Sequence, residues 1–242
     1  MAPILGLERI CKRFGAVVVA DGIDLALREG EALGIIGPNG AGKTTLFGIA
    51  SGTLAPDAGR VVFAGEDVTW LSPQQRCRKG LARSFQIPQP FTHMTVFENV
   101  VVAAAFGNGE REAAVYERCA GLLERCGLVA KANLRAGMLT LLDRKRLELA
   151  RALATRPRLL LLDEIAGGLT EHECSALIAL IKEVREGGVS VIWIEHVVHA
   201  LLATVDRLAV LHGGRIIAEG DPQRVIKSAE VAEIYMGIAA DA

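Results

Sequence analysis

Residues 34–46 have the sequence GIIGPNGAGKTTL, an apolar run followed by a glycine-rich turn, a lysine and two threonines. Packing does not explain the three glycines of the turn at 37–42, because glycine adds no side chain to a core and loses more conformational freedom on folding than any other residue. Glycines suit a backbone that turns tightly and approaches a ligand. The spacing matches G-x-x-x-x-G-K-[ST], in which backbone N–H groups and a helix N-terminus surround phosphate oxygens. The stretch therefore predicts a nucleoside-triphosphate site.

The residues around this motif agree with it. Residues 31–37 (EALGIIG) are typical of a buried strand, and residues 43–52 (KTTLFGIASG) are typical of the start of a helix. We expect Lys43 to reach the β- and γ-phosphates and the Thr44 hydroxyl to bind Mg²⁺. The predicted nucleotide-binding residues of the loop are Gly37, Pro38, Asn39, Gly40, Ala41, Gly42, Lys43, Thr44 and Thr45.

Composition limits the classes of protein that can carry this site. The chain has 242 residues and is 51% hydrophobic, enough for a sizeable core. Its longest apolar run covers residues 100–106, far short of the ~20 residues of a membrane span, and no signal peptide is expected. A net charge of −1 provides no overall attraction to nucleic acid. The five cysteines lack C-x-x-C spacing, so they indicate reduced packing residues of a cytosolic protein.

The chain alternates strand and helix patterns. We expect antiparallel strands within residues 5–36, with a turn at residues 29–30, and further strands at 59–68 and 81–86. Three apolar runs predict parallel strands, the first two separated by a helix over 171–186. These runs are RLLLLDE (158–164), VSVIWIEH (189–196) and DRLAVL (206–211).

Three capping patterns mark where helices begin. A Ser or Thr followed three positions later by Gln or Glu is a capping box, and such pairs occur at Ser72/Gln75, Thr95/Glu98 and Thr170/Glu173. Residues 95–155 have almost entirely helical periodicity. The predicted fold class is α/β, with an antiparallel N-terminal part and a helical insertion over about 87–155.

Four polar residues follow predicted strands. Asp163 and Glu164 end a strand that is apolar on both faces, and ligands bind at that end of open α/β sheets. Asp163 suits a metal-facing position, and Glu164 suits a residue that orients or deprotonates the attacking water. His196, at the end of another strand, could donate to the γ-phosphate, and Gln86 ends a third. Taken singly, such acids also serve as helix caps, and a histidine or glutamine there is often structural.

The order and spacing of 37–44, Gln86, Asp163, Glu164 and His196 resemble the nucleotide-binding subunit of an ATP-binding cassette (ABC) transporter. The resemblance covers essentially the whole chain. It implies one ABC ATPase domain over 1–242, with a RecA-like P-loop NTPase core, that binds ATP and Mg²⁺.

The same resemblance implies a role for each motif residue. Phe14 stacks on adenine, Gln86 contacts Mg²⁺ and water, and Asp163 is an acid near the metal. Glu164 is the catalytic base, His196 contacts the γ-phosphate, and residues 166–169 touch a second ATPase chain.

The resemblance is closest to the ATPases of branched-chain and hydrophobic amino-acid importers, on residues 83–100 and 194–225. It implies a peripheral subunit on the cytoplasmic face of the membrane. Its implied partners are a second ABC ATPase (the same or a different chain), permease subunits and, indirectly, a periplasmic binding protein, with no nucleic acid. Importers of amides or urea remain an alternative, as does a soluble ABC ATPase, although the chain lacks the tandem cassettes and long coiled-coil insertions of that class. A GTPase is disfavoured because no [NT]-K-x-D pattern occurs.

The loop over residues 87–95 (IPQPFTHMT) carries two prolines, which fix an extended path, together with Phe91 and Met94. Apolar side chains on such a loop either tuck under it or form a docking surface. We favour docking to a cytoplasmic helix of a membrane partner.

One motif departs from the family. ABC ATPases usually carry Leu-Ser-Gly-Gly-Gln before the helix that here contains KRLELARAL, whereas this chain has LTLLD at 139–143. Thr140 keeps a hydroxyl that could contact the partner's nucleotide. Leu142 replaces a glycine, and Asp143 adds a negative charge that residues 144–146 could offset. The variant is either without consequence or indicates an asymmetric heterodimer.

Overall fold

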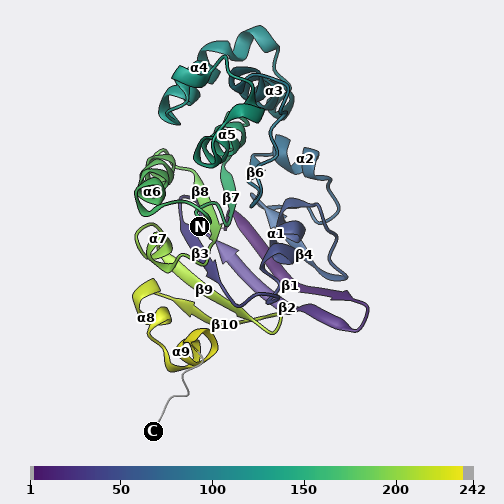
Figure 1. Ribbon diagram of the computed structural model, residues 1–242. Coiled ribbons are helices and arrows are strands. Elements are labelled where there is room, and N and C mark those ends of the chain that lie inside the picture. The colour runs from purple at the N-terminus through teal and green to yellow at the C-terminus, as the bar shows by residue number, and fades with distance from the viewer. Residues whose placement is uncertain (1–2, 237–242) are drawn as a thin grey trace.

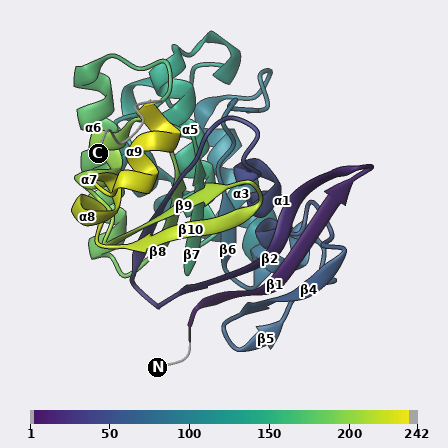
Figure 2. The ribbon, with the colours of Figure 1, turned by 90° about the horizontal axis from the view of Figure 1, so that it is seen from below.

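The computed structural model, which describes residues 3–236, contains two β-sheets flanked by helices (Figure 1). The first is antiparallel with strand order β2-β1-β4-β5. Its strands are β1 (Leu5–Phe14), β2 (Val17–Leu27), β4 (Ala58–Phe63) and β5 (Glu66–Asp67). β1 and β2 form a long hairpin, which projects from the molecule in Figure 2. The predicted antiparallel N-terminal part is therefore confirmed over residues 5–27.

The second sheet has the order β10-β9-β3-β8-β7-β6. Its strands are β3 (Ala32–Ile36), β6 (Leu81–Arg83), β7 (Leu159–Asp163), β8 (Ser190–Ile194), β9 (Arg207–His212) and β10 (Arg215–Gly220). The expectation that residues 32–36 are antiparallel was wrong, since β3 pairs in parallel with β8 and β9. Its all-apolar, fully buried sequence is the pattern of a central parallel strand.

Alternate residues of the central strands face two separate cores. Leu159 and Leu161 pack towards the antiparallel sheet and α1 (Lys43–Ser51), whereas Leu160 and Leu162 pack towards the helices on the opposite face. Side chains of a strand alternate between faces, so covering both faces requires an uninterrupted apolar run. Because β3, β7 and β8 run parallel to one another, their carboxyl ends lie at the same edge of the sheet.

The helical insertion lies between β6 and β7 and extends away from the sheets (Figure 1). It contains α3 (Val96–Asn108), α4 (Tyr116–Arg125) and α5 (Leu141–Ala154), with the 3₁₀ turns η1 (Glu112–Val115), η2 (Val129–Lys131) and η3 (Ala136–Met138) between them. The predicted capping boxes are present at α2 (Pro73–Arg78), α3 and α6 (Glu171–Glu186). Cys119 and Cys126 are buried in the apolar core, in agreement with a packing role.

Several predicted boundaries shift. β6 ends at Arg83, so Gln86 lies in the following loop, and β8 ends at Ile194, two residues before His196. β10 and the helices α7 (Val198–Leu202), α8 (Pro222–Ile226) and α9 (Ala229–Met236) follow without having been predicted. Within residues 3–236, no helix combines the length and apolarity needed to cross a membrane.

Candidate nucleotide-binding site

The loop over 37–42 connects β3 to α1, and two of its glycines are required by close backbone contacts. A Cβ on Gly37 would lie 2.2 Å from the carbonyl oxygen of Leu211. Gly42 has φ +103°, and a Cβ there would lie 2.5 Å from the carbonyl oxygen of Val19. Neither position accepts a side chain, so the loop is held in one path that ends at the N-terminus of α1.

Lys43, the first residue of α1, is 8% exposed. Its Nζ donates to the carbonyl oxygens of Gly37 at 2.7 Å and Pro38 at 3.1 Å. Burial lowers the pKa of Lys43, and the charges of Glu164 and Asp163 act in the opposite direction. The ammonium is therefore folded back over the loop, close to both acids.

A cavity of about 390 Å³ opens beside this loop. It brings together residues from distant parts of the chain, namely Phe14, Val19, Asn39, Gly40, Ala41, Gly42, Lys43, Thr44, Thr45, Gln86 and Glu164. The predicted residues Gly37, Pro38, Asp163, His196 and Thr140 are not among its lining residues. The first four still lie near it through contacts to the loop or to Glu164, but Thr140 belongs to the insertion.

Glu164 is positioned by its backbone and by Gln86. Its φ of +46° is in the left-handed region, which costs free energy for a residue with a Cβ and often marks a functional site. Gln86 Nε2 donates to Glu164 Oε2 at 2.5 Å. Asp163, the last residue of β7, instead pairs with Arg83, whose Nη2 lies 2.7 Å from Asp163 Oδ2. Both acids are thus held by residues of the segment 83–86.

His196 Nδ1 lies 4.0 Å from Glu164 Oε2 and 3.5 Å from Glu195 Oε1. Sequence reasoning missed Glu195, although a charged residue directly after an apolar strand was a signal. Its fully buried carboxylate accepts from the backbone N–H of Ala166 at 3.1 Å and of His196 at 3.3 Å. Burial raises the pKa of Glu195. This carboxylate therefore connects His196 to the loop after Glu164.

Thr140 caps α5, because its Oγ1 accepts from the backbone N–H of Asp143 at 3.3 Å. It also donates to Asp143 Oδ2 at 2.7 Å. Asp143 is buried and forms an ion pair with Lys131, a residue that the sequence analysis did not consider. The negative charge at this position is therefore paired within the chain.

The site suits a hard divalent cation as well as a triphosphate. The Thr44 hydroxyl and the Gln86 amide line the cavity, and the Asp163 carboxylate adjoins it. Oxygen ligands of this kind are those that Mg²⁺ prefers. A parallel sheet, a phosphate-binding loop at the end of a strand and two acids at the end of a neighbouring strand define a P-loop nucleoside triphosphatase.

Comparison with known proteins identifies the family. The ABC transporter family model matches residues 20–167. BraF of Pseudomonas aeruginosa, a high-affinity branched-chain amino acid transport ATP-binding protein, is 37% identical over 97% of this chain and 98% of its own. LivG of Salmonella typhimurium, which has the same description, is 35% identical with the same coverage. This chain belongs to the ABC transporter family, as one of its ATP-binding subunits.

Solved structures agree with this assignment. A nucleotide-free ATP-binding cassette from an ABC transporter has a TM-score of 0.88 and 32% identity, and covers 98% of this chain and 100% of its own. The ADP conformation of MJ1267, also an ATP-binding cassette of an ABC transporter, has a TM-score of 0.89 at the same identity and coverage. The predicted fold class is thereby confirmed.

Proposed function

We propose that this chain is the ATP-hydrolysing subunit of an importer for branched-chain or other hydrophobic amino acids. The Gln86–Glu164 contact at the cavity carries the catalytic part of the proposal, because it holds a carboxylate beside the phosphate-binding loop. The substrate class rests on the described function of BraF and LivG, which match nearly the whole chain.

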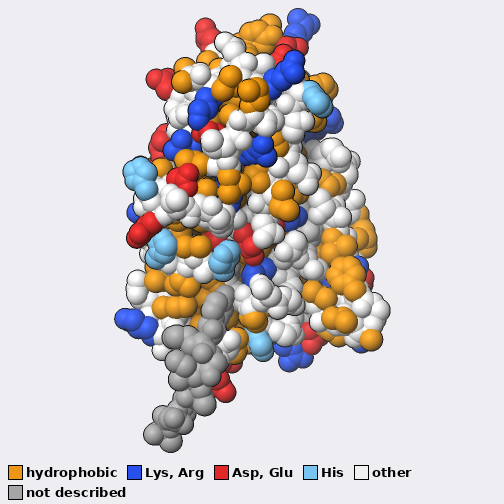
Figure 3. All heavy atoms as spheres, viewed as in Figure 1, with side chains coloured by type: hydrophobic (Ala, Val, Ile, Leu, Met, Phe, Trp, Pro, Cys, Tyr) orange, Lys and Arg blue, Asp and Glu red, His pale blue; other side chains and the backbone are white. Residues whose placement is uncertain are grey.

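The residues divide the reaction between them. The loop amides and Lys43 bind the phosphates, and Phe14, 49% exposed on the β1–β2 hairpin, stacks on adenine. Figure 3 shows hydrophobic side chains gathered on the side of the molecule where Figure 1 draws this hairpin. Thr44, Gln86 and Asp163 would hold Mg²⁺, which shields the phosphate charge when bound.

Glu164 accepts the proton of the attacking water, and its contact with Gln86 fixes the direction in which its carboxylate points. His196 donates to the γ-phosphate. Residues 166–169 and Thr140 face a second ATPase chain, either identical or different, so that hydrolysis takes place at a dimer interface.

An apolar groove lined by residues of α2, α3 and α5 provides a docking surface for a cytoplasmic helix of the permease. Its outer part, of about 650 Å³, is lined by apolar side chains that include Phe85, Phe91 and Phe106. Phe91 is 48% exposed and lines this groove, whereas Met94 is half-buried and lines a neighbouring pocket together with Phe106. This supports the docking role expected of residues 87–95.

Contacts within the chain hold this loop in place. Asn99 accepts from the backbone N–H of Phe91 at 2.8 Å and donates to its carbonyl oxygen at 3.1 Å. Arg151 donates to the carbonyl oxygen of Gln89 at 2.9 Å, and its guanidinium lies 5.3 Å from the Phe91 ring centroid. An ordered loop loses less entropy when a partner docks, so the protein would sit at the cytoplasmic face of the membrane through this groove.

The test is reconstitution. The tagged chain is expressed with its neighbouring transporter genes, purified from membranes and placed in liposomes with the cognate binding protein. We expect co-purification with a polytopic membrane protein, and ATP hydrolysis that rises when leucine, isoleucine or valine is supplied. A Lys43→Ala chain serves as the inactive control. Stimulation by amides or urea alone would contradict the substrate class, and purification without any membrane protein would contradict the transport role.

A further inference from the structure

The segment 83–86 contacts both acids of the site through its first and last residues. Arg83 pairs with Asp163 and Gln86 donates to Glu164. Between them, the Ser84 backbone N–H donates to the carbonyl oxygen of Leu161 at 2.9 Å, and Ser84 Oγ accepts from the backbone N–H of Asp163 at 3.3 Å. The segment is thus fixed to the end of β7. The proposed function gives Gln86 a role at Mg²⁺ and at Glu164, whereas it gives Arg83 no role.

The Arg83–Asp163 pair is buried, with the two side chains 10% and 5% exposed. Removing one partner of a buried ion pair leaves the other charge uncompensated and is strongly destabilising. The pair is made by a single contact, from Nη2 to Oδ2, rather than by the bidentate fork that arginine and a carboxylate form at their strongest. Arg83 therefore holds Asp163 through one of the two carboxylate oxygens.

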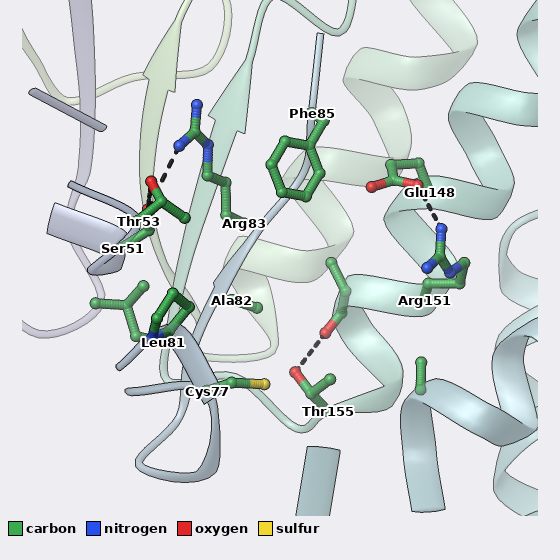
Figure 4. A pocket seen from close by; sticks show the side chains of 13 residues that line it. Ser51, Thr53, Cys77, Leu81, Ala82, Arg83, Phe85, Glu148, Arg151 and Thr155 are labelled. Carbon is green, nitrogen blue, oxygen red and sulfur yellow. Dashed lines mark hydrogen bonds and ion pairs between the residues drawn. The ribbon is translucent and has the colours of Figure 1, made fainter. Parts of the chain in front are cut away.

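The guanidinium has other contacts that do not depend on Asp163. It lies 5.2 Å from the Phe85 ring centroid and 5.7 Å from that of Phe47. Its Nη1 lies 3.4 Å from Ser51 Oγ, and Figure 4 draws this contact among the side chains that line a pocket beside β6. Nε is buried without a hydrogen-bond partner among the described residues. Aromatic faces and the hydroxyl can retain the cation after it leaves the carboxylate.

The positive charge of Arg83 decides whether this residue favours or opposes the binding of a cation near Asp163. A divalent cation held near Asp163 is repelled by a guanidinium beside the same carboxylate, and such repulsion is strong where water is partly excluded. We propose that Arg83 is a positioning residue of the magnesium site, which holds Asp163 in the nucleotide-free protein and releases it when Mg²⁺ binds with ATP. This inference rests on the assignment of Asp163 to magnesium in the proposed function.

The experiment measures affinity rather than turnover. The dissociation constant of a fluorescent, non-hydrolysable ATP analogue is measured for the purified chain twice, once in EDTA and once in excess Mg²⁺. The constant in EDTA divided by the constant in Mg²⁺ gives the enhancement of affinity by magnesium. Arg83→Met should raise this enhancement on the order of tenfold, because the competing charge is gone. Arg83→Lys, which keeps the charge, should remain closer to the wild type. Arg111→Met removes an exposed arginine of the insertion and should change nothing.

An unchanged or smaller enhancement in Arg83→Met, beside a clear enhancement in the wild type, would overturn the inference and leave the proposed function standing. If Mg²⁺ did not change the affinity of the wild type for the ATP analogue, the magnesium assignment and this inference would both be overturned. The two failures are therefore distinguishable.

A second measurement covers the case in which Arg83→Met folds poorly. The urea midpoint of the nucleotide-free protein is compared for Arg83→Met, Asp163→Asn and the double variant. If the ion pair is formed, Arg83→Met should lower the midpoint at least twice as far in the wild type as in the Asp163→Asn background. Equal shifts in both backgrounds would show that the two charges are not coupled, and the inference would fail.

Discussion

Gln86 and Glu164 come from loops that follow different strands, yet Gln86 Nε2 lies 2.5 Å from Glu164 Oε2 beside the phosphate-binding loop. β6 and β7 are neighbours in the parallel sheet, so the residues that follow them meet at the same edge. The contact places the proposed base directly against the segment that lines the docking groove. In the proposed function, nucleotide chemistry and partner contact would thus share one stretch of chain.

Glu164→Gln should bind ATP with near-normal affinity but lose most of its hydrolysis. A positioned acid–base group contributes about 10²–10⁴-fold to a rate, and the amide cannot accept the proton. Steady-state phosphate release in the assembled transporter measures the loss, with the exposed Glu186→Gln as control. Near-normal turnover of Glu164→Gln would remove this residue from the role of base.

Lys43→Ala should weaken nucleotide binding itself. A hydrogen bond to a charged group contributes about 1.5–3 kcal/mol, so the dissociation constant for ATP should rise roughly 10- to 100-fold. Fluorescence titration of the isolated chain measures it. A dissociation constant within twofold of the wild type would contradict the proposed contact of Lys43 with the phosphates.

Phe91→Asp and Met94→Asp should each leave ATP binding by the isolated chain intact but prevent assembly with the permease. A charge buried without a partner in an apolar interface weakens binding strongly. Co-purification from membranes measures assembly. Val129→Asp places the same charge on an exposed apolar residue away from the groove and should assemble normally. Normal assembly and transport by both loop variants would show that the loop is not the docking surface.

The 139–143 variant predicts two unequal sites in the transporter. Leu142 lies in the first turn of α5, where a glycine would allow closer approach of the backbone to a partner's phosphate. A partner ATPase with a regular signature would complete this chain's site, and the partner's own site would turn over slowly. Glu164→Gln should therefore reduce ATPase activity far more than the equivalent change in the partner. Equal losses, or full activity of this chain as a homodimer, would contradict the asymmetry.

Glu195 should make stability depend on pH. Burial raises its pKa above the ordinary value of 4.5, so the folded protein holds this proton more tightly than the unfolded chain does. The resulting stabilisation is fully present below pH 4.5 and is lost as the pH rises through the folded pKa. Glu195→Gln cannot titrate and escapes that loss.

Urea unfolding at pH 5 and 7.5 measures this effect. The stability of Glu195→Gln relative to the wild type should increase with pH, whatever the absolute effect of the substitution. The neighbouring residues His196 and Lys145 are present in both proteins, so the two differ only in the carboxyl group at position 195. A parallel pH dependence of the two proteins would show that Glu195 does not contribute to it.

The phosphate-binding loop could be predicted because its determinants are local. Gly37, Gly42 and Lys43 lie within seven consecutive residues, and the strand and helix around them have their own apolar patterns. The capping boxes were predictable for the same reason, since a capping residue and its backbone partner are three positions apart. Asp163 and Glu164 were also apparent, because an acid after a fully apolar strand requires a partner.

Only the tertiary structure decided which distant residues meet. The sequence could not show that β3 lies between β8 and β9, because a short apolar run fits either sheet and its neighbours are set by packing over the whole chain. The buried Glu195 and the Arg83–Asp163 pair depend on that strand order. The sequence by itself thus determined the local structure around the predicted phosphate-binding loop, from β3 to α1. Long-range pairing decided which charges face the acids, because contacts between distant segments form only when the sheet is assembled.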